Sequence, residues 1–122
     1  MGINVKELIA LLRKCKADNY LRIDSSPVSL TPAGVGSYRG FYDDLAIHVD
    51  MERSSTLTVI DFVKVLEESV GTIMTGYKGG EYPIRGSTRV WISNYGECSR
   101  ARVTGVRSED CGFTLITWEL VD

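Results

Sequence analysis

Apolar residues recur at helical spacing in two segments of the chain, and the first of these is residues 4–16. Its apolar positions share one face of a helix and are Val5, Leu8, Ile9 and Leu12. Asn4 and Glu7 have the types and the spacing of a capping box, in which each side chain accepts a hydrogen bond from the other residue's backbone. The pattern therefore predicts a helix that begins directly after Asn4.

The second helical segment covers residues 58–71 and carries the same kind of signals. Thr58 and Asp61 form a capping-box-like start, and Gly71 is a suitable C-terminal stop. The apolar stripe expected to be buried comprises Ile60, Val63, Val65 and Leu66. We therefore predict a second helix over this range.

Alternation of apolar and polar residues predicts strands elsewhere. The alternating segments are residues 20–25, 45–51, 88–94, 100–107 and 112–120. Glycine and proline interrupt residues 27–36, which we expect to be irregular or a short edge strand. Residues 72–88 are rich in glycine, which predicts a loop with a short strand. In the last strand, Ile116, Trp118 and Leu120 are expected to share one face, with Trp118 in the core.

Together these elements predict an α+β fold. Two helices would pack on a mostly antiparallel β-sheet. With 122 residues and no internal repeat or linker, the chain is expected to form one domain over residues 1–122.

Composition excludes several classes of protein. Hydrophobic residues make up 43% and charged residues 25% of the chain, which is close to the globular average and does not indicate disorder. The net charge of −2 argues against a DNA- or RNA-binding protein with a broad basic face. Apolar runs are too short for a membrane span, and the N-terminus lacks an export signal. We therefore expect a cytoplasmic protein with no membrane partner.

Catalytic and metal-binding patterns are weak. His48 is the single histidine, and it lies in an alternating segment as a partly exposed strand histidine would. Asp43 and Asp44 are adjacent, so in regular structure their side chains point in different directions, and we expect them to mark a solvated turn. The three cysteines, Cys15, Cys98 and Cys111, have no metal-ligand spacing. We predict no catalytic residue, no metal site and no cofactor.

The most informative charges lie between Lys78 and Arg107. This segment holds six cations, five of them arginine, and only two carboxylates, a local charge of +4. Arginine binds phosphate in a bidentate manner, and interleaved aromatic rings can stack on a base. The aromatic residues are Tyr77, Tyr82, Trp91 and Tyr95. The pattern favours a small nucleotide ligand, whereas the alternative is that the arginines pair with acids elsewhere and Trp91 is core.

A glycine-rich stretch opens this segment. Residues 75–82 lack the order of a phosphate-binding P-loop, although glycine would let backbone N–H groups approach a phosphate closely. The alternative is a plain hairpin connection. The stretch contributes Thr75 and Tyr77 to the candidate ligand-binding residues.

Four segments in order, "SYRGFYDDLAI", "TGYKGGEYPI", "VWISNYGECS" and "VTGVR", resemble a family of small phage proteins. This is the first-described type of Thoeris anti-defence protein. The resemblance extends from about Tyr20 to Thr117. It implies a protein that binds cyclic ADP-ribose isomers made by bacterial TIR-domain proteins and sequesters them without cleavage. It also implies ligand sites at the contacts of a homodimer, which some members extend to a hexamer that holds cyclic oligonucleotides as well.

The resemblance also assigns roles to residues. Tyr82 would stack on the adenine, Arg39 and Arg107 would hold the pyrophosphate, and Asn94 would read a base edge or a ribose hydroxyl. The full candidate ligand-binding set is Arg39, Tyr42, Thr75, Tyr77, Tyr82, Trp91, Asn94, Arg102 and Arg107.

Two other classes of function stay open from the sequence. One is an enzyme that degrades such a cyclic nucleotide with Asp43, Asp44 or His48. The other is a protein-interaction module without a small ligand, in which the exposed aromatics form a contact patch.

Overall fold

The computed structural model describes residues 2–25, 30–38, 41–50, 56–75, 80–94, 97–109 and 112–121; side chains are described for all of these except 37–38, 41–43, 94 and 97–100. Two helices, α1 (Val5–Arg13) and α2 (Val59–Ser69), combine with eight strands. The strands are β1 (Tyr20–Ile23), β2 (Thr31–Tyr38), β3 (Phe41–Asp50), β4 (Ile73–Thr75), β5 (Glu81–Pro83), β6 (Val90–Asn94), β7 (Glu97–Ser108) and β8 (Phe113–Leu120).

Both helices begin where their capping residues predict. The Asn4 side chain accepts a hydrogen bond from the Glu7 backbone N–H at 2.8 Å, and Glu7 accepts one from the Asn4 N–H at 3.1 Å. Thr58 and Asp61 form the same reciprocal pair ahead of α2. Gly71 has φ +88°, a left-handed conformation that suits glycine just past the end of α2.

Six strands form one mixed sheet in the order β1-β8-β7-β6-β3-β2, and β4 and β5 form a separate hairpin. The α+β class and the two helices are confirmed. The sheet, however, is mixed, because β1–β8 and β3–β6 are parallel pairs while its other three pairs are antiparallel. The chain between β3 and β6 contains α2 and the β4–β5 hairpin. This connection is long enough for β6 to run parallel to β3.

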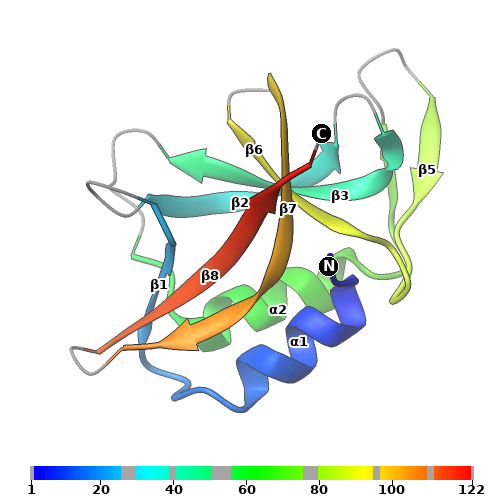
Figure 1. Cartoon of the computed structure of the whole chain (residues 1–122). Coiled ribbons are helices and arrows are strands. Elements are labelled where there is room, and N and C mark those ends of the chain that lie inside the picture. The colour runs from blue at the N-terminus through cyan, green and yellow to red at the C-terminus, as the bar shows by residue number, and fades with distance from the viewer. Residues whose placement is uncertain are drawn as a thin grey trace.

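The large sheet curls until its two outer strands meet. Ile23 at the end of β1 and Leu30 just before β2 exchange two backbone hydrogen bonds, of 2.7 and 3.1 Å. The result is a partly closed barrel with both helices on one side of it (Figure 1). Residues 27–36 are predicted to be irregular or a short edge strand. Residues 31–36 belong to β2, an outer strand of eight residues, and residues 27–29 lie outside the described residues.

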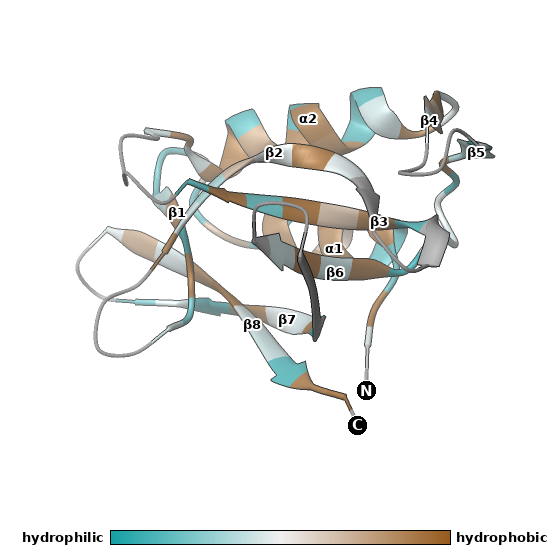
Figure 2. Ribbon diagram, turned by 90° about the horizontal axis from the view of Figure 1, so that it is seen from above, coloured by the Kyte–Doolittle hydropathy of each residue, from teal (hydrophilic) through white to brown (hydrophobic). Residues whose placement is uncertain are grey.

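The helices pack against the inner face of the curled sheet. Their buried side chains include Leu8, Leu12, Phe62 and Leu66. These meet inward-facing strand residues such as Leu45 and Ile47, and hydrophobic bands run along β3 and β6 (Figure 2). All six of these side chains are fully buried, which makes this layer the main core of the protein.

One sequence prediction about burial is wrong, that of Ile60. Ile60 is 38% exposed, and the buried stripe of α2 consists of Val59, Phe62, Val63 and Leu66. Leu120 is 69% exposed although Ile116, on the same strand, is fully buried. Leu120 lies at the end of β8, where the helices do not cover the sheet.

Candidate functional site

The N-terminal segment enters the sheet between β6 and β7. Ile3 donates its backbone N–H to the carbonyl of Val103 at 3.0 Å and accepts from the N–H of Val90 at 3.2 Å. It therefore occupies the place where β6 and β7 diverge beyond the paired residues Trp91 and Arg102.

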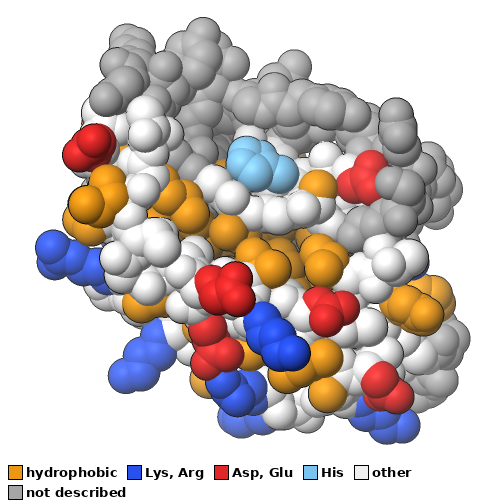
Figure 3. Space-filling view, turned by 180° about the vertical axis from the view of Figure 1, so that it is seen from behind, with side chains coloured by type: hydrophobic (Ala, Val, Ile, Leu, Met, Phe, Trp, Pro, Cys, Tyr) orange, Lys and Arg blue, Asp and Glu red, His pale blue; other side chains and the backbone are white. Residues whose placement is uncertain are grey.

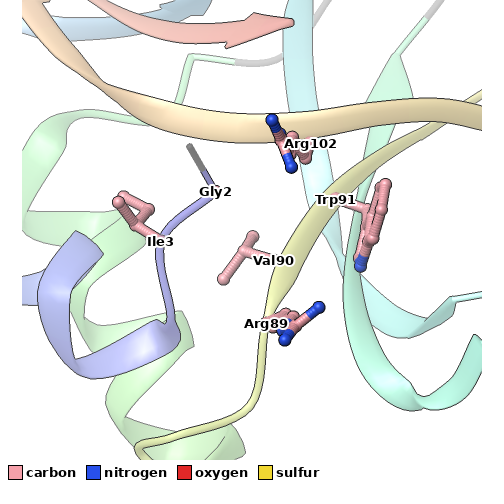
Figure 4. Close-up of a pocket in the computed structure, with 6 residues that line it drawn as sticks. All are labelled: Gly2, Ile3, Arg89, Val90, Trp91 and Arg102. Atoms are coloured by element: carbon pink, nitrogen blue, oxygen red, sulfur yellow. The ribbon is translucent and has the colours of Figure 1, made fainter. Parts of the chain in front are cut away.

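A hollow of about 190 Å³ lies against this junction. Its lining residues are Gly2, Ile3, Arg89, Val90, Trp91 and Arg102. In Figure 4, Arg102 on β7 and Arg89 just ahead of β6 lie on opposite sides of the hollow, with Val90 between them. Two of the predicted ligand-binding residues, Trp91 and Arg102, are thus brought together.

Arg102 is held by a carboxylate. Its Nε and Nη2 atoms lie 2.6 and 2.5 Å from Oε1 of Glu119, its cross-strand partner on β8. The hydrogen bond from Arg102 lowers the pKa of Glu119, so the carboxylate stays charged under mildly acidic conditions. The expectation that these arginines pair with acids elsewhere therefore holds for Arg102.

Arg89 differs from Arg102. Its side chain is exposed, and within the part of the chain that the structure describes it has no ion-pair partner. Its guanidinium therefore supplies positive charge to the hollow that no described carboxylate neutralises.

Trp91 contributes a mostly buried ring. The residue is 7% exposed and packs with Ala46 and Val121 on the outer face of the sheet. Its indole N–H donates to Oδ2 of Asp44 at 2.8 Å. The prediction that Asp44 marks a solvated turn is therefore wrong, because Asp44 lies within β3 and fixes the orientation of Trp91.

Arg107 lies outside this hollow. It follows Arg102 by five positions on β7, and its guanidinium contacts Glu109 at 3.0 Å and Asp24 at 3.5 Å. The hydrogen bond to Glu109 and the negative charge of Asp24 raise its pKa. In one chain, Arg107 and Arg102 are therefore parts of two separate ion-pair groups.

Tyr82 and Thr75 belong to the β4–β5 hairpin, a sheet distinct from the one that forms the hollow. Tyr82 pairs with Met74 and Thr75 with Glu81. The Tyr82 ring lies so close to Gly80 that a Cβ atom there would be 2.6 Å from the phenolic oxygen. A larger residue at position 80 would therefore require the Tyr82 ring to move.

The remaining predicted residues are placed only in part. Tyr42 belongs to β3 and Asn94 to β6, but their side chains lie outside the described residues. Arg39 and Tyr77 lie outside the described residues entirely. The backbone of Asp43 is described, but its side chain is not.

His48 is a half-buried strand histidine, as predicted. It lies over Gly36 of the neighbouring strand, where an added Cβ would be 2.5 Å from Nε2. Burial lowers the pKa of the imidazole, so the neutral form is favoured. Figure 3 shows this histidine at the surface, above a band in which acidic and basic side chains alternate. It is not a lining residue of the hollow.

The sequence did not point to three features of the hollow. Arg89 was counted in the basic segment but was not chosen as a ligand-binding residue, and Glu119 was not considered. The strand-flanking position of Arg89 beside Trp91 is a signal that could have identified it. Nothing in the N-terminal sequence indicates that Gly2 and Ile3 line the hollow.

No model of a known protein family, no curated protein and no solved structure matches this chain. Among the described helices, none has the length and apolar character needed to cross a membrane.

Proposed function

We propose that this protein binds a cyclic ADP-ribose-type signal and sequesters it without cleavage, so that a Thoeris effector is not activated. The observation that carries the proposal is the hollow in which Arg89 and Arg102 lie on opposite sides, beside Trp91. Two guanidinium groups suit a diphosphate, because arginine donates paired hydrogen bonds to phosphate oxygens. The resemblance to the phage anti-defence family supplies the identity of the ligand.

The size of the hollow favours a site shared between two chains. Ligand pockets commonly measure about 300–1,000 Å³, whereas this hollow measures about 190 Å³. The hollow can hold the phosphate part of a nucleotide, and the base would then have to bind to another surface. Tyr82 and Arg107 lie on other parts of the chain, so a second copy would have to bring them to the ligand. We therefore propose a homodimer, which further assembly would extend to a hexamer.

Binding without cleavage is the simplest chemistry for these residues. Hydrolysis of a diphosphate requires a positioned base or a metal ion. Within the described residues, no group of three or more His, Cys, Asp or Glu side chains gathers to hold a metal ion, and His48 does not line the hollow. A sequestering role requires affinity and no such group.

The test is to incubate the full chain with a cyclic ADP-ribose isomer, remove unbound nucleotide, denature the protein by heat and identify the released nucleotide by mass spectrometry. Recovery of the intact nucleotide in proportion to protein supports the proposal. Recovery of a cleaved product contradicts it and favours the degrading enzyme. Cyclic oligonucleotides in parallel samples would reveal a second ligand class.

Variants locate the site. Arg89→Ala, Arg102→Ala and, from the resemblance, Arg39→Ala and Arg107→Ala should each weaken nucleotide binding while the protein stays folded. The matched control is Arg13→Ala, because Arg13 on α1 is exposed and ion-paired with Glu67 away from the hollow. Unchanged affinity in all four variants would show that the pocket is elsewhere.

One observation favours the alternative of a protein-interaction module. Tyr20 is 46% exposed, and the Arg22 guanidinium carbon lies 5.8 Å from its ring centroid and 5.2 Å from that of Phe113. Aromatic and arginine side chains are enriched at protein interfaces. A thermal-shift series separates the two functions: bound nucleotide raises the melting temperature by mass action, and an absent shift at high nucleotide concentration would favour the module.

A further inference from the structure

The two arginines of the hollow are in different electrostatic states. Arg102 donates its Nε–H to Oε1 of Glu119, and its Nη2 atom lies 2.5 Å from the same oxygen. Arg89 has no carboxylate partner within the described part of the chain. An anion that enters the hollow therefore meets the Arg89 guanidinium, which no described carboxylate contacts. It also meets the Arg102 guanidinium, which is already in an ion pair.

The ion pair of Arg102 and Glu119 is accessible from solvent. Their side chains are 36% and 41% exposed, and they are direct cross-strand neighbours on β7 and β8. Ion pairs that are exposed to this degree are weak because water screens them and both side chains lose freedom. A doubly charged anion that binds both arginines can therefore compete with the single carboxylate.

We propose that Glu119 is an internal competitor of the ligand: it occupies Arg102 when the hollow is free of ligand, and a phosphate group takes its place. Arg89 supplies the cation that is available before this exchange. The hollow then selects anions that contact both guanidinium groups, such as a diphosphate, over small monoanions that contact one. The identity of the biological ligand rests on the proposed function. The exchange of Glu119 for a phosphate group on Arg102 can be tested with any suitable anion.

The experiment measures the affinity of the full chain for inorganic pyrophosphate by isothermal titration calorimetry at low salt. The Glu119→Gln variant removes the competing charge and keeps the shape of the side chain. It should bind pyrophosphate about two- to fivefold more tightly, the range expected when a weak exposed ion pair no longer has to be broken. The matched control is Glu67→Gln, which alters the carboxylate of another exposed ion pair, formed with Arg13 away from the hollow, and should leave the affinity unchanged.

A second variant tests the other arginine. Arg89→Gln should weaken pyrophosphate binding at least fivefold, because it removes a charge-assisted contact. Circular dichroism of each variant establishes that it is folded. Unchanged or weaker binding by Glu119→Gln would overturn the inference, and weaker binding would show that Glu119 orients Arg102 for the ligand. Absence of pyrophosphate binding by the unaltered protein would overturn it as well.

Failure of the proposed function gives a different result. If pyrophosphate binding responds to these variants as expected but no cyclic ADP-ribose isomer binds, the exchange at Glu119 stands and the assigned ligand is wrong. If the cyclic nucleotide binds but pyrophosphate does not, the assigned ligand stands and the exchange is wrong.

Discussion

The two faces of strands β3 and β6 differ in what covers them. Inward-facing Leu45 and Ile47 belong to a large cluster that includes both helices, and both are fully buried. Outward-facing Ala46 and Trp91 form a small cluster with only Val121 packed against it in the described residues. The inner face therefore provides most of the stability, whereas the outer face keeps polar contacts and the arginines of the hollow.

The largest expected effect tests the inner face. Phe62→Ala on α2 removes a fully buried ring and should lower the free energy of unfolding by about 3–5 kcal/mol. Urea denaturation followed by circular dichroism measures this change. Ile60→Ala on the same helix is the control, because Ile60 is 38% exposed and should lose far less. Equal losses would contradict the assignment of the inner layer as the main core.

The next effect tests the outer face. Trp91→Phe keeps an aromatic ring but removes the N–H that Asp44 accepts, and should lower the free energy of unfolding by about 1–3 kcal/mol. The loss should be smaller when Asp44 is already replaced by Asn, since the two residues interact directly. Additive losses in the double variant would show that the hydrogen bond contributes nothing measurable.

A smaller effect concerns the start of α2. Thr58→Ala removes the side-chain acceptor for the Asp61 backbone N–H and should lower the free energy of unfolding by about 1 kcal/mol. Thr58→Ser keeps the acceptor and should restore most of the stability. If serine is no better than alanine, packing of the threonine methyl group explains the loss instead.

The smallest effect is a pH dependence on the outer face. Burial lowers the pKa of His48 in the folded protein, so the unfolded chain binds a proton more readily. Stability should therefore fall as the pH drops below the ordinary histidine value of 6.5 and through the lowered one. Thermal melts at a series of pH values measure this, and His48→Gln should flatten the profile over that window. An unchanged profile in the variant would place the responsible group elsewhere.

Much of the secondary structure could be predicted because its signals are local. The capping boxes at Asn4 and Thr58 and the alternation in the C-terminal strands identify elements within a few residues of their observed bounds. The candidate site could be predicted only in part. Trp91 and Arg102 meet because β6 and β7 pair in one register, but Arg107 and Tyr82 lie in other places.

Long-range arrangement accounts for what the sequence did not predict. Ile60 has the spacing of a buried residue, yet the crossing of α2 over the sheet turns a different stripe inward. Asp44 looked like part of a solvated pair until its strand placed it beside Trp91. The position of Ile3 between β6 and β7 depends on hydrogen bonds to residues about 90 to 100 positions away.

By itself, the sequence determined the two helices, most of the strands, the α+β class and a basic, aromatic C-terminal segment. These follow from periodicity, capping and composition, which act between near neighbours in the chain. Only the tertiary structure decided the mixed strand order, the hollow at the N-terminal segment, and which arginine is paired with a carboxylate. Those features depend on strand register and on contacts between distant residues, and local sequence patterns carry little information about either.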